Sequence, residues 1–338
     1  MRTAVLRDAF GVAHLMLESR EVPKPGPGEA LVRIDAVALN HRDWMVVSGR
    51  YNPRQSLPLV PGSDAAGRVV ALGDGVTRVR VGDRVCPAFA QKWLSGPPTR
   101  AALKTTLGSP LDGVLSRYVV FHEDGLVHPP ERFSDLEAAC LPCAAVTAWN
   151  ALVTHGAIER GQTVLLLGTG GVSIFALQLA KSLGARVLIT SKSNHKLERA
   201  RALGADETLN YTLAETLDVW ARRVTGGDGV DLVVDVVGGE NLAPCIRAAR
   251  PGGRVAMIGV LAGDSVELDL RPVIMRQIRL QGMIVGSRAS FEAMNAHLET
   301  STLVPVMDRV YRFEEFQAAF LDCARGEHFG KICIQLED

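Results

Sequence analysis

Three closely spaced glycines, Gly168, Gly170 and Gly171, are the residues in this chain with the clearest chemical use. They follow the apolar run Val164–Leu167, which is typical of a parallel strand buried on both faces. From Val172 to Leu183 the apolar residues have helical spacing. A glycine turn between strand and helix lets the backbone approach a pyrophosphate, and the helix N-terminus offers it N–H groups and a favourable dipole. We therefore predict a dinucleotide-binding loop at Gly168, Gly170, Gly171 and Val172.

One position departs from the G-x-G-x-x-G pattern, because Ser173 stands where its third glycine would be. That glycine permits close packing of helix on strand. Ser173 therefore predicts slightly looser packing or a different register for the phosphate.

The residues after the next expected strand indicate which dinucleotide is bound. An acidic residue about 20 positions past the glycines would bind a ribose 2′-hydroxyl, but neither Asp nor Glu occurs between Gly184 and Glu198. Ser191, Lys192 and Lys196 are found there instead. Hydroxyl and ammonium groups suit a 2′-phosphate, so we predict NADP(H) as the cofactor. The alternative is that these side chains are simply solvated in a polar loop.

Strands and helices alternate from Ser134 onward, which predicts a doubly wound parallel sheet of the Rossmann type. The expected strands are Val164–Leu167, Arg186–Thr190, Val230–Val236, Arg254–Ile258 and Leu280–Val285. The expected helices are Val172–Leu183, His195–Leu203, Ala214–Val224 and Asn241–Ala249.

The chain before Pro129 has short alternating segments separated by Gly and Pro, which predicts a β-rich unit. Its expected strands are Arg2–Leu6, Ala30–Leu39, Gly67–Leu72, Arg84–Ala88 and Arg117–Phe121. The tail should add a helix at Phe313–Cys323 and a strand at Lys331–Leu336, and should return to the β-rich unit. The predicted fold class is therefore α/β with two domains, as expected for 338 residues.

Composition excludes several classes of function. Lys plus Arg and Asp plus Glu number 37 each, so no net field favours nucleic acid or an anionic membrane. We find no apolar span of membrane-crossing length and no signal-peptide core. The six cysteines are scattered in apolar runs, which is typical of buried thiols in a reducing cytoplasm. We expect a cytoplasmic protein that acts on a small molecule.

Ordered motifs along nearly the whole chain resemble the medium-chain dehydrogenase/reductase superfamily. They are PGPGEALVRI at 25–34, LVPGSDAAGRVVALG at 59–73, VGDRV at 81–85, LPCAAVTAWNAL at 141–152, the glycine loop, and LGADETLNY at 203–211. The resemblance implies a GroES-like β-rich catalytic domain at 1–130 and 289–338, with a Rossmann dinucleotide-binding domain at 131–288.

The superfamily has zinc-dependent and zinc-independent branches, and the ligand positions separate them. Asn40 stands in place of the first ligand, a Cys, and Ser63 in place of the second, a His. Cys143 matches the third ligand. A catalytic zinc wants three protein ligands and an open position, and the four-Cys loop of a structural zinc is also missing. We therefore expect no metal.

The chain resembles the quinone oxidoreductase-like, zinc-independent branch, and that resemblance implies further site residues. Asn40 would lie beside the nicotinamide, with Asp43 in the same cleft and Thr147 near the carboxamide. Lys196 and Tyr211 would contact the adenosine phosphate, and the nicotinamide end would be lined by Gly259, Val260 and Val285–Ser287. For Tyr211 and Val285, simple packing is the alternative. Tyr51 is a candidate proton donor, and with Phe89 and Trp93 it is expected to line a substrate pocket.

These residues are compatible with three alternative functions. The leading hypothesis is an NADP(H)-dependent reductase that transfers hydride to a carbonyl-conjugated acceptor such as a quinone, enone or aldehyde, polarised by donors such as the Asn40 amide. The second is a zinc-type alcohol dehydrogenase, and the third is a non-catalytic NAD(P)-binding regulatory protein. The family habit of pairing sheets through the last strand, here Leu280–Val285, implies a homodimer.

Overall fold

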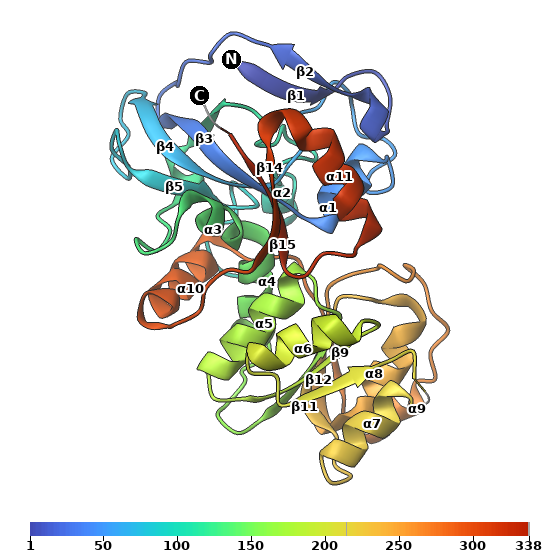
Figure 1. Ribbon diagram of the computed structural model, residues 1–338. Coiled ribbons are helices and arrows are strands. Elements are labelled where there is room, and N and C mark those ends of the chain that lie inside the picture. The colour runs from blue at the N-terminus through green and yellow to red at the C-terminus, as the bar shows by residue number, and fades with distance from the viewer. Residues whose placement is uncertain (214, 337–338) are drawn as a thin grey trace. The chain divides into compact units, whose positions relative to one another are not determined.

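The structure is a computed structural model that describes residues 1–213 and 215–336 (Figure 1). These residues form two compact units, one of residues 1–146 and 286–336 and the other of residues 147–213 and 215–285. The predicted boundary after residue 130 falls earlier than this division. The reason is that helix α3 (Asp135–Ala139) packs on strands of the first unit. At the other boundary, residues 286–288 lie in the first unit rather than in the predicted Rossmann domain.

The first unit is built on a seven-stranded sheet with the order β14-β15-β3-β4-β5-β7, in which β6 also pairs with β3. The strands of this sheet are β3 (Glu29–Leu39), β4 (Asp64–Leu72), β5 (Arg84–Pro87), β6 (Tyr118–His122), β7 (Leu126–Val127), β14 (Met307–Arg312) and β15 (Lys331–Gln335). Strands β1 (Arg2–Leu6) and β2 (Leu15–Ser19) form a separate two-stranded sheet in the same unit. Its other helices are α1 (His41–Val47), α2 (Arg100–Leu103), α10 (Arg288–Thr300) and α11 (Phe316–Arg325). Figure 1 shows β15, drawn in red, beside β3, so the tail returns to this sheet as predicted.

Buried aliphatic and aromatic side chains from this sheet and from α11 form the core of the first unit. The sequence predicts strands β1, β3, β4, β5, β6 and β15 and helix α11, but not strands β2, β7 and β14 or helices α1, α2, α3 and α10. Helix α1 is short and begins with a capping box, in which Asn40 and Asp43 satisfy each other's backbone N–H groups. The sequence feature that marks this helix is therefore the spacing of its two capping residues, rather than a long periodic pattern of apolar residues.

The second unit is a six-stranded parallel sheet with the order β10-β9-β8-β11-β12-β13. Its strands are β8 (Thr163–Leu167), β9 (Arg186–Ser191), β10 (Glu207–Asn210), β11 (Val230–Asp235), β12 (Ala249–Met257) and β13 (Arg279–Gly282). Its helices are α4 (Val146–Trp149, whose first residue belongs to the first unit), α5 (Gly171–Ser182), α6 (Asn194–Ala202), α7 (Leu217–Val224), α8 (Leu242–Ala248) and α9 (Arg271–Met275). Ala214, the first residue of one predicted helix, lies outside the described residues.

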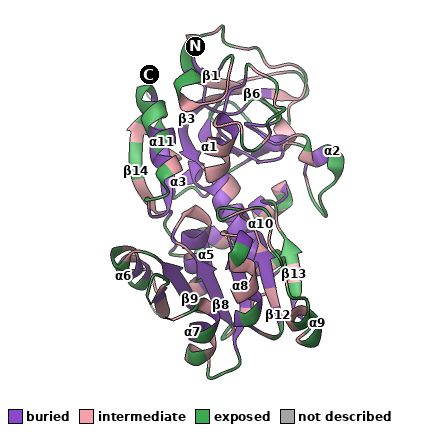
Figure 2. Ribbon diagram, turned by 90° about the vertical axis from the view of Figure 1, so that its right-hand side faces the viewer, coloured by how far each residue is buried: buried purple, intermediate pink, exposed green. Residues whose placement is uncertain are grey.

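The strand order of this sheet reverses between β8 and β11, which is the switch point where doubly wound sheets bind ligands. Figure 2 shows β8 and β9 as buried strands, whereas α6, α7 and α9 expose much of their surface. The predicted Rossmann-type sheet is confirmed, with one shortened element. Strand β13 ends at Gly282 rather than at Val285, whose φ of 39° does not continue an extended strand.

Candidate functional site

The glycine loop lies between the end of β8 and the start of α5, as predicted. Gly168 has a φ of +72°, which favours glycine, and Gly170 is the N-cap residue of α5. A Cβ atom placed at either glycine would meet no heavy atom within 4 Å, so the space beside the loop is open. No side chain caps α5, whose first residues are Gly171 and Val172. The exposed N–H groups of this helix end therefore suit an anion.

Ser173 does not loosen the packing of α5. Its side chain is buried, and its hydroxyl donates to the carbonyl oxygen of Leu167 at 2.7 Å. The serine hydroxyl is therefore accommodated at this position of the glycine pattern by a hydrogen bond to the last residue of β8.

The residues predicted to select the dinucleotide lie at the carboxyl end of β9 and in the loop after it. Ser191 is the last residue of the strand and is buried, and its hydroxyl accepts from the backbone N–H of Ser193 at 3.3 Å. Lys192 is exposed, and Lys196 lies in the first turn of α6. Tyr211 is exposed, and its backbone N–H donates to the Ser191 carbonyl at 3.3 Å. The structure therefore brings Ser191 and Tyr211 together at this strand end.

Gly259 and Val260 follow strand β12, which lies beside β11 in the sheet. A Cβ atom on Gly259 would come within 2.0 Å of the carbonyl oxygen of Val236, so only glycine fits this approach. Val260 is half-exposed. Close packing thus accounts for Gly259, and the exposed Val260 side chain is available to a ligand.

The other residues predicted near the nicotinamide are divided between the two units. Val285 is buried, and its carbonyl oxygen accepts from the Asn150 amide at 2.6 Å. Thr147 is buried in α4 of the same unit. Ser287 belongs to the first unit, where its hydroxyl caps α10 by accepting from the N–H of Ser290 at 3.2 Å.

In the first unit, neighbouring strand ends bring together three polar residues that are far apart in sequence. Asn40 directly follows β3, Asp64 begins β4, and Lys331 begins β15. The antiparallel register pairs Asp64 with Ala38 and Ile332 with Leu39. This places Asp64 and Lys331 on either side of the strand end that carries Asn40.

Lys331 is the centre of this cluster. Its ammonium donates to the Asn40 Oδ1 at 2.6 Å and to the Leu39 carbonyl at 2.9 Å, and it lies 3.6 Å from the Asp64 carboxylate. The Lys331 and Asp64 side chains are 2% and 0% exposed. Asp64 in turn accepts from the backbone N–H of Cys143 at 3.2 Å.

Asp43 is enclosed by contacts within the protein. One carboxylate oxygen accepts from the Asn40 backbone N–H at 2.8 Å, and the other accepts from the Ser63 hydroxyl at 3.1 Å. The Asn40 amide nitrogen also donates to the Ser63 oxygen, at 3.4 Å. Asp43 is 1% exposed. The structure therefore brings Asp43 to Asn40 as predicted, but as a buried group that holds Asn40 and Ser63.

Burial sets the electrostatics of the cluster. It raises the pKa of Asp64 from 3.8 to about 6, although the Lys331 charge and the Asn40 amide act in the opposite direction. It also raises the pKa of Asp43, against the charge of Arg42. Burial, the largest single effect, would lower the pKa of Lys331, but the Asp64 carboxylate together with Cys140, Cys143 and Cys333 raises it, and the net shift is upward. At neutral pH, Lys331 and Asp64 therefore form a buried ion pair.

The residues at the three zinc-ligand positions are poor ligands for a metal ion. Asn40 and Ser63 offer an amide and a hydroxyl, and burial raises the pKa of the Cys143 thiol, which disfavours the thiolate that binds metal. In addition, the Lys331 ammonium donates a hydrogen bond to the Asn40 Oδ1. Across residues 1–213 and 215–336, no three His, Cys, Asp or Glu side chains are grouped so that they could hold a metal ion.

Two of the three aromatic residues predicted to line a pocket, Tyr51 and Phe89, pack against a cation. The Arg42 guanidinium is 4.8 Å from the ring centre of Tyr51 and 4.7 Å from that of Phe89. Arg42 also lies 3.6 Å from Asp43, so Tyr51 is linked to the Asn40 cluster through two side chains. Trp93 is buried, and its indole N–H donates to the Gly96 carbonyl at 2.9 Å. The Arg42 guanidinium therefore packs against both the Tyr51 and the Phe89 rings.

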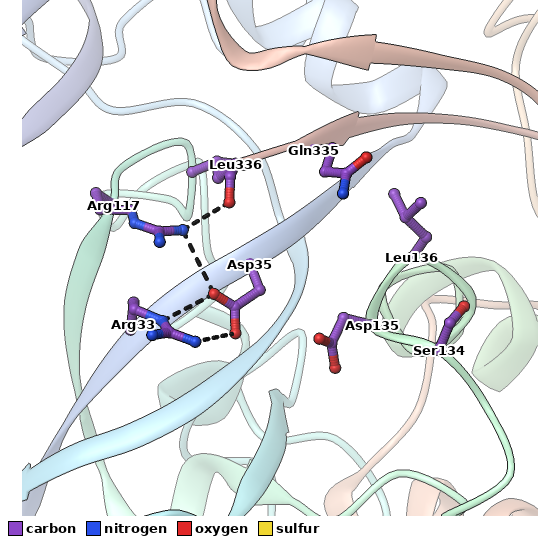
Figure 3. A pocket seen from close by; sticks show the side chains of 8 residues that line it. All are labelled: Arg33, Asp35, Arg117, Ser134, Asp135, Leu136, Gln335 and Leu336. Atoms are coloured by element: carbon purple, nitrogen blue, oxygen red, sulfur yellow. Dashed lines mark hydrogen bonds and ion pairs between the residues drawn. The ribbon is translucent and has the colours of Figure 1, made fainter. Parts of the chain in front are cut away.

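Figure 3 shows a polar hollow of about 440 Å³ elsewhere in the first unit. Asp35 lies at its centre and accepts from Arg33 at 2.9 Å and from Arg117 at 3.4 Å. Arg117 also donates to the Leu336 carbonyl at 2.6 Å. None of the predicted site residues lines this hollow, and its charges are already paired.

Sequence reasoning missed Lys331 and Asp64. Lys331 was included only as the first residue of a predicted strand, and Asp64 only as part of the motif at 59–73. The available signal was position, since Asp64 follows the zinc-ligand position Ser63 and Lys331 opens an otherwise apolar strand. Their meeting depends on strand register, which the sequence does not display.

Comparison with known proteins identifies the family to which the two units belong. The family model described as alcohol dehydrogenase GroES-like domain matches residues 26–131, and the model described as zinc-binding dehydrogenase matches residues 171–300. A zinc-type alcohol dehydrogenase-like protein of Schizosaccharomyces pombe is 38% identical over 100% of this chain and 99% of its own length. The chain belongs to the medium-chain dehydrogenase/reductase superfamily. It is therefore a member of a superfamily of oxidoreductases, with the expected GroES-like and Rossmann-like folds.

Two solved structures of this superfamily match almost the whole chain. A putative alcohol dehydrogenase from Sinorhizobium meliloti 1021 is 40% identical with a TM-score of 0.90, covering 95% of this chain and 94% of that one. A structure described as an NAD-dependent alcohol dehydrogenase is 35% identical with a TM-score of 0.90, covering 100% of both chains. Among the helices of the described residues, none is long and apolar enough to cross a bilayer.

Proposed function

We propose that this chain is an NADP(H)-dependent, zinc-independent oxidoreductase that reduces a small carbonyl-conjugated acceptor, such as a quinone, enone or aldehyde. The observation that carries the proposal is the contact between Asn40 and Lys331 at 2.6 Å, in the place where zinc-dependent relatives bind their metal. A neutral hydrogen-bond donor backed by a buried cation is suited to an oxygen that gains negative charge.

The second unit holds the features that fit the cofactor. The open space beside Gly168 and Gly170 and the uncapped start of α5 fit a pyrophosphate. Lys192 and Lys196 would bind the 2′-phosphate, and Gly171 would offer its backbone to the phosphates. When bound, the nicotinamide supplies the hydride. The protein contributes binding and orientation.

The first unit supplies the groups that act on the acceptor. The Asn40 amide nitrogen would donate to the acceptor oxygen in place of its long contact to Ser63. Asp43 holds the backbone of Asn40 and so orients its side chain. Tyr51, half-exposed, is the candidate for proton delivery, since a phenol can donate without a metal.

Zinc independence rests on the donor set described above. Oxidation of an alcohol requires loss of a hydroxyl proton, which a zinc ion favours by lowering the pKa of a bound oxygen. Asn40 and Ser63 do not provide the imidazole and thiolate ligands that zinc prefers. An acceptor that needs only hydride and stabilisation of a developing oxyanion matches the residues present.

The names of three relatives favour a second candidate, a zinc-type alcohol dehydrogenase, and one of these names describes an NAD-dependent enzyme. Against it stand the zinc-ligand replacements and the absence of an acidic residue at the end of β9, where Ser191 is found. A third candidate is a regulatory protein that binds NAD(P) without turnover.

A substrate panel separates these candidates. Quinones, enones, aldehydes and primary alcohols would be assayed with NADPH or NADH, and with the oxidised cofactors for the alcohols. We expect the quinones and enones to be reduced fastest, with NADPH preferred. Fast oxidation of alcohols with NAD would support the second candidate, and cofactor binding without turnover of any acceptor would support the third.

We also propose that the protein is a cytoplasmic homodimer. Strand β13 is at the edge of its sheet and pairs only with β12 among the described strands. Shortly before it, Ile274 and Met275 are 68% and 80% exposed. An unpaired strand edge beside exposed apolar side chains suits association with a second copy.

A further inference from the structure

We propose that Lys331 is a positioning residue for catalysis, which holds the Asn40 amide with its oxygen turned inward and its nitrogen available to the substrate, and strengthens that nitrogen as a donor. The inference rests on the proposed function, because it assigns Asn40 the role of hydrogen-bond donor. It concerns a side chain that no metal-site or cofactor motif contains.

The contacts of Lys331 fix the orientation of the Asn40 amide. An ammonium group has donors only, so it selects the Asn40 oxygen and excludes the nitrogen. The distance of 2.6 Å is that of a strong charge-assisted hydrogen bond. Without this cation, the oxygen and nitrogen of the amide could exchange places by rotation of the side chain. Lys331 therefore decides which end of Asn40 faces a ligand.

The same contact strengthens Asn40 as a donor. A positive charge on the amide oxygen draws electron density from the nitrogen, and hydrogen bonds linked in this way reinforce each other in a site of low dielectric. The Asn40 amide also hydrogen-bonds the Asp64 carboxylate, and its nitrogen makes a long contact, 3.4 Å, to Ser63. This is the contact that a substrate oxygen would replace.

Lys331 acts through Asn40 rather than on the substrate itself. It is 2% exposed, and its ammonium faces Leu39, Asn40 and Asp64. The Leu39 carbonyl and the Asn40 Oδ1 accept two of the three N–H bonds of the ammonium. Asp64 balances the charge at 3.6 Å, which keeps the cation tolerable in a buried site.

A double-mutant cycle tests this coupling. Lys331→Met alone would leave Asp64 as a buried unpaired charge, so the test variant is Lys331→Met with Asp64→Asn, which removes both charges while nearly keeping the volume. It is compared with wild type, Asn40→Ala and the triple variant. The readouts are kcat and KM for an enone or quinone with NADPH, and thermal unfolding verifies that each variant is folded.

We expect Lys331→Met/Asp64→Asn to lower kcat about 10-fold while the KM for NADPH stays within about twofold. In the Asn40→Ala background, the same two changes should lower kcat less than twofold further, because the residue through which they act is gone. Lys331→Arg, which keeps charge and donors, should retain more activity than the neutral pair. Equal losses with and without Asn40, or full activity of the neutral pair, would overturn the proposal.

A second readout does not depend on activity. The side-chain amide of Asn40 gives a ¹⁵N–¹H₂ signal pair that is identified by its loss in Asn40→Ala. We expect this pair to shift in Lys331→Met/Asp64→Asn and much less in Lys192→Ala, which changes a lysine of the second unit. An unchanged pair would contradict the positioning role. If the protein reduces no acceptor, the proposed function fails, whereas this spectrum still decides whether Lys331 holds Asn40.

Discussion

The Ser173 hydroxyl donates to the Leu167 carbonyl at 2.7 Å and so ties helix α5 to the end of β8. A buried carbonyl that loses its donor costs about 1–3 kcal/mol. We therefore expect Ser173→Ala to lower the free energy of unfolding by that amount, measured by denaturant titration. Ser182→Ala is the matched control, since its hydroxyl bonds Leu179 within the same helix and is partly exposed. Equal small effects of both changes would show that the Ser173 bond contributes little.

Most of the parallel sheet could be predicted from the sequence because its central strands are largely apolar runs of strand length. Val164–Leu167 and Arg186–Thr190 lie within one residue of the ends of β8 and β9. Strand β10 (Glu207–Asn210) and helix α10 (Arg288–Thr300) were missed. Strand β10 is short and half-buried, and no helix is expected from the sequence between Val285 and Phe313. Weak periodicity gives little local signal for such elements.

The candidate site could be predicted only where one motif contains it. The glycine loop is contiguous, so its residues were found together. The Asn40 cluster is assembled by the pairing of β15 and β4 with β3, and Lys331 lies 291 positions after Asn40. Nothing in the local sequence at Lys331 indicates that its partners are Asn40 and Asp64. The Arg42 side chain between Tyr51 and Phe89 was missed for the same reason.

Lys192→Ala should weaken NADPH binding selectively. A charge-assisted hydrogen bond to the 2′-phosphate contributes about 1.5–3 kcal/mol, or roughly 10–150-fold in affinity. We expect the Kd for NADPH to rise within that range and the Kd for NADH to change little, both measured by titration calorimetry. Lys24→Ala, another exposed lysine, controls for net charge. Parallel losses for both cofactors, or tighter binding of NADH by the wild type, would contradict the assignment.

Protein purified without added metal should contain far less than one zinc per chain by elemental analysis. The reason is that Asn40 and Ser63 leave Cys143 as the single conventional ligand, with a thiol that burial keeps protonated. Treatment with a chelator should leave enone or quinone reduction unchanged. Stoichiometric zinc, or activity lost to the chelator and restored by zinc, would reverse this conclusion.

Replacing exposed apolar residues near β13 should disrupt the proposed dimer. Ile274→Glu and Met275→Glu would place carboxylates beside the sheet edge, and we expect the mass measured by light scattering to fall from two chains to one. Leu321→Glu, on α11 of the other unit, is a control because that side chain is also half-exposed. A wild type that is monomeric at all concentrations tested would refute the dimer directly.

The buried carboxyl of Asp64 should make stability depend on pH in a defined direction. Its pKa is raised from 3.8 to about 6 by burial, so the folded state holds the proton more tightly than the unfolded state. Stability from this group is then fully present below about pH 4 and is lost as the pH rises through 6, by about 3 kcal/mol. Asp64→Asn lacks this titration, whereas Asp43 remains in both proteins and its contribution largely cancels. We therefore expect the free energy of unfolding of wild type, relative to Asp64→Asn, to decrease between pH 4 and pH 7 in denaturant titrations. Parallel curves for the two proteins would mean that Asp64 is not an acid with a raised pKa.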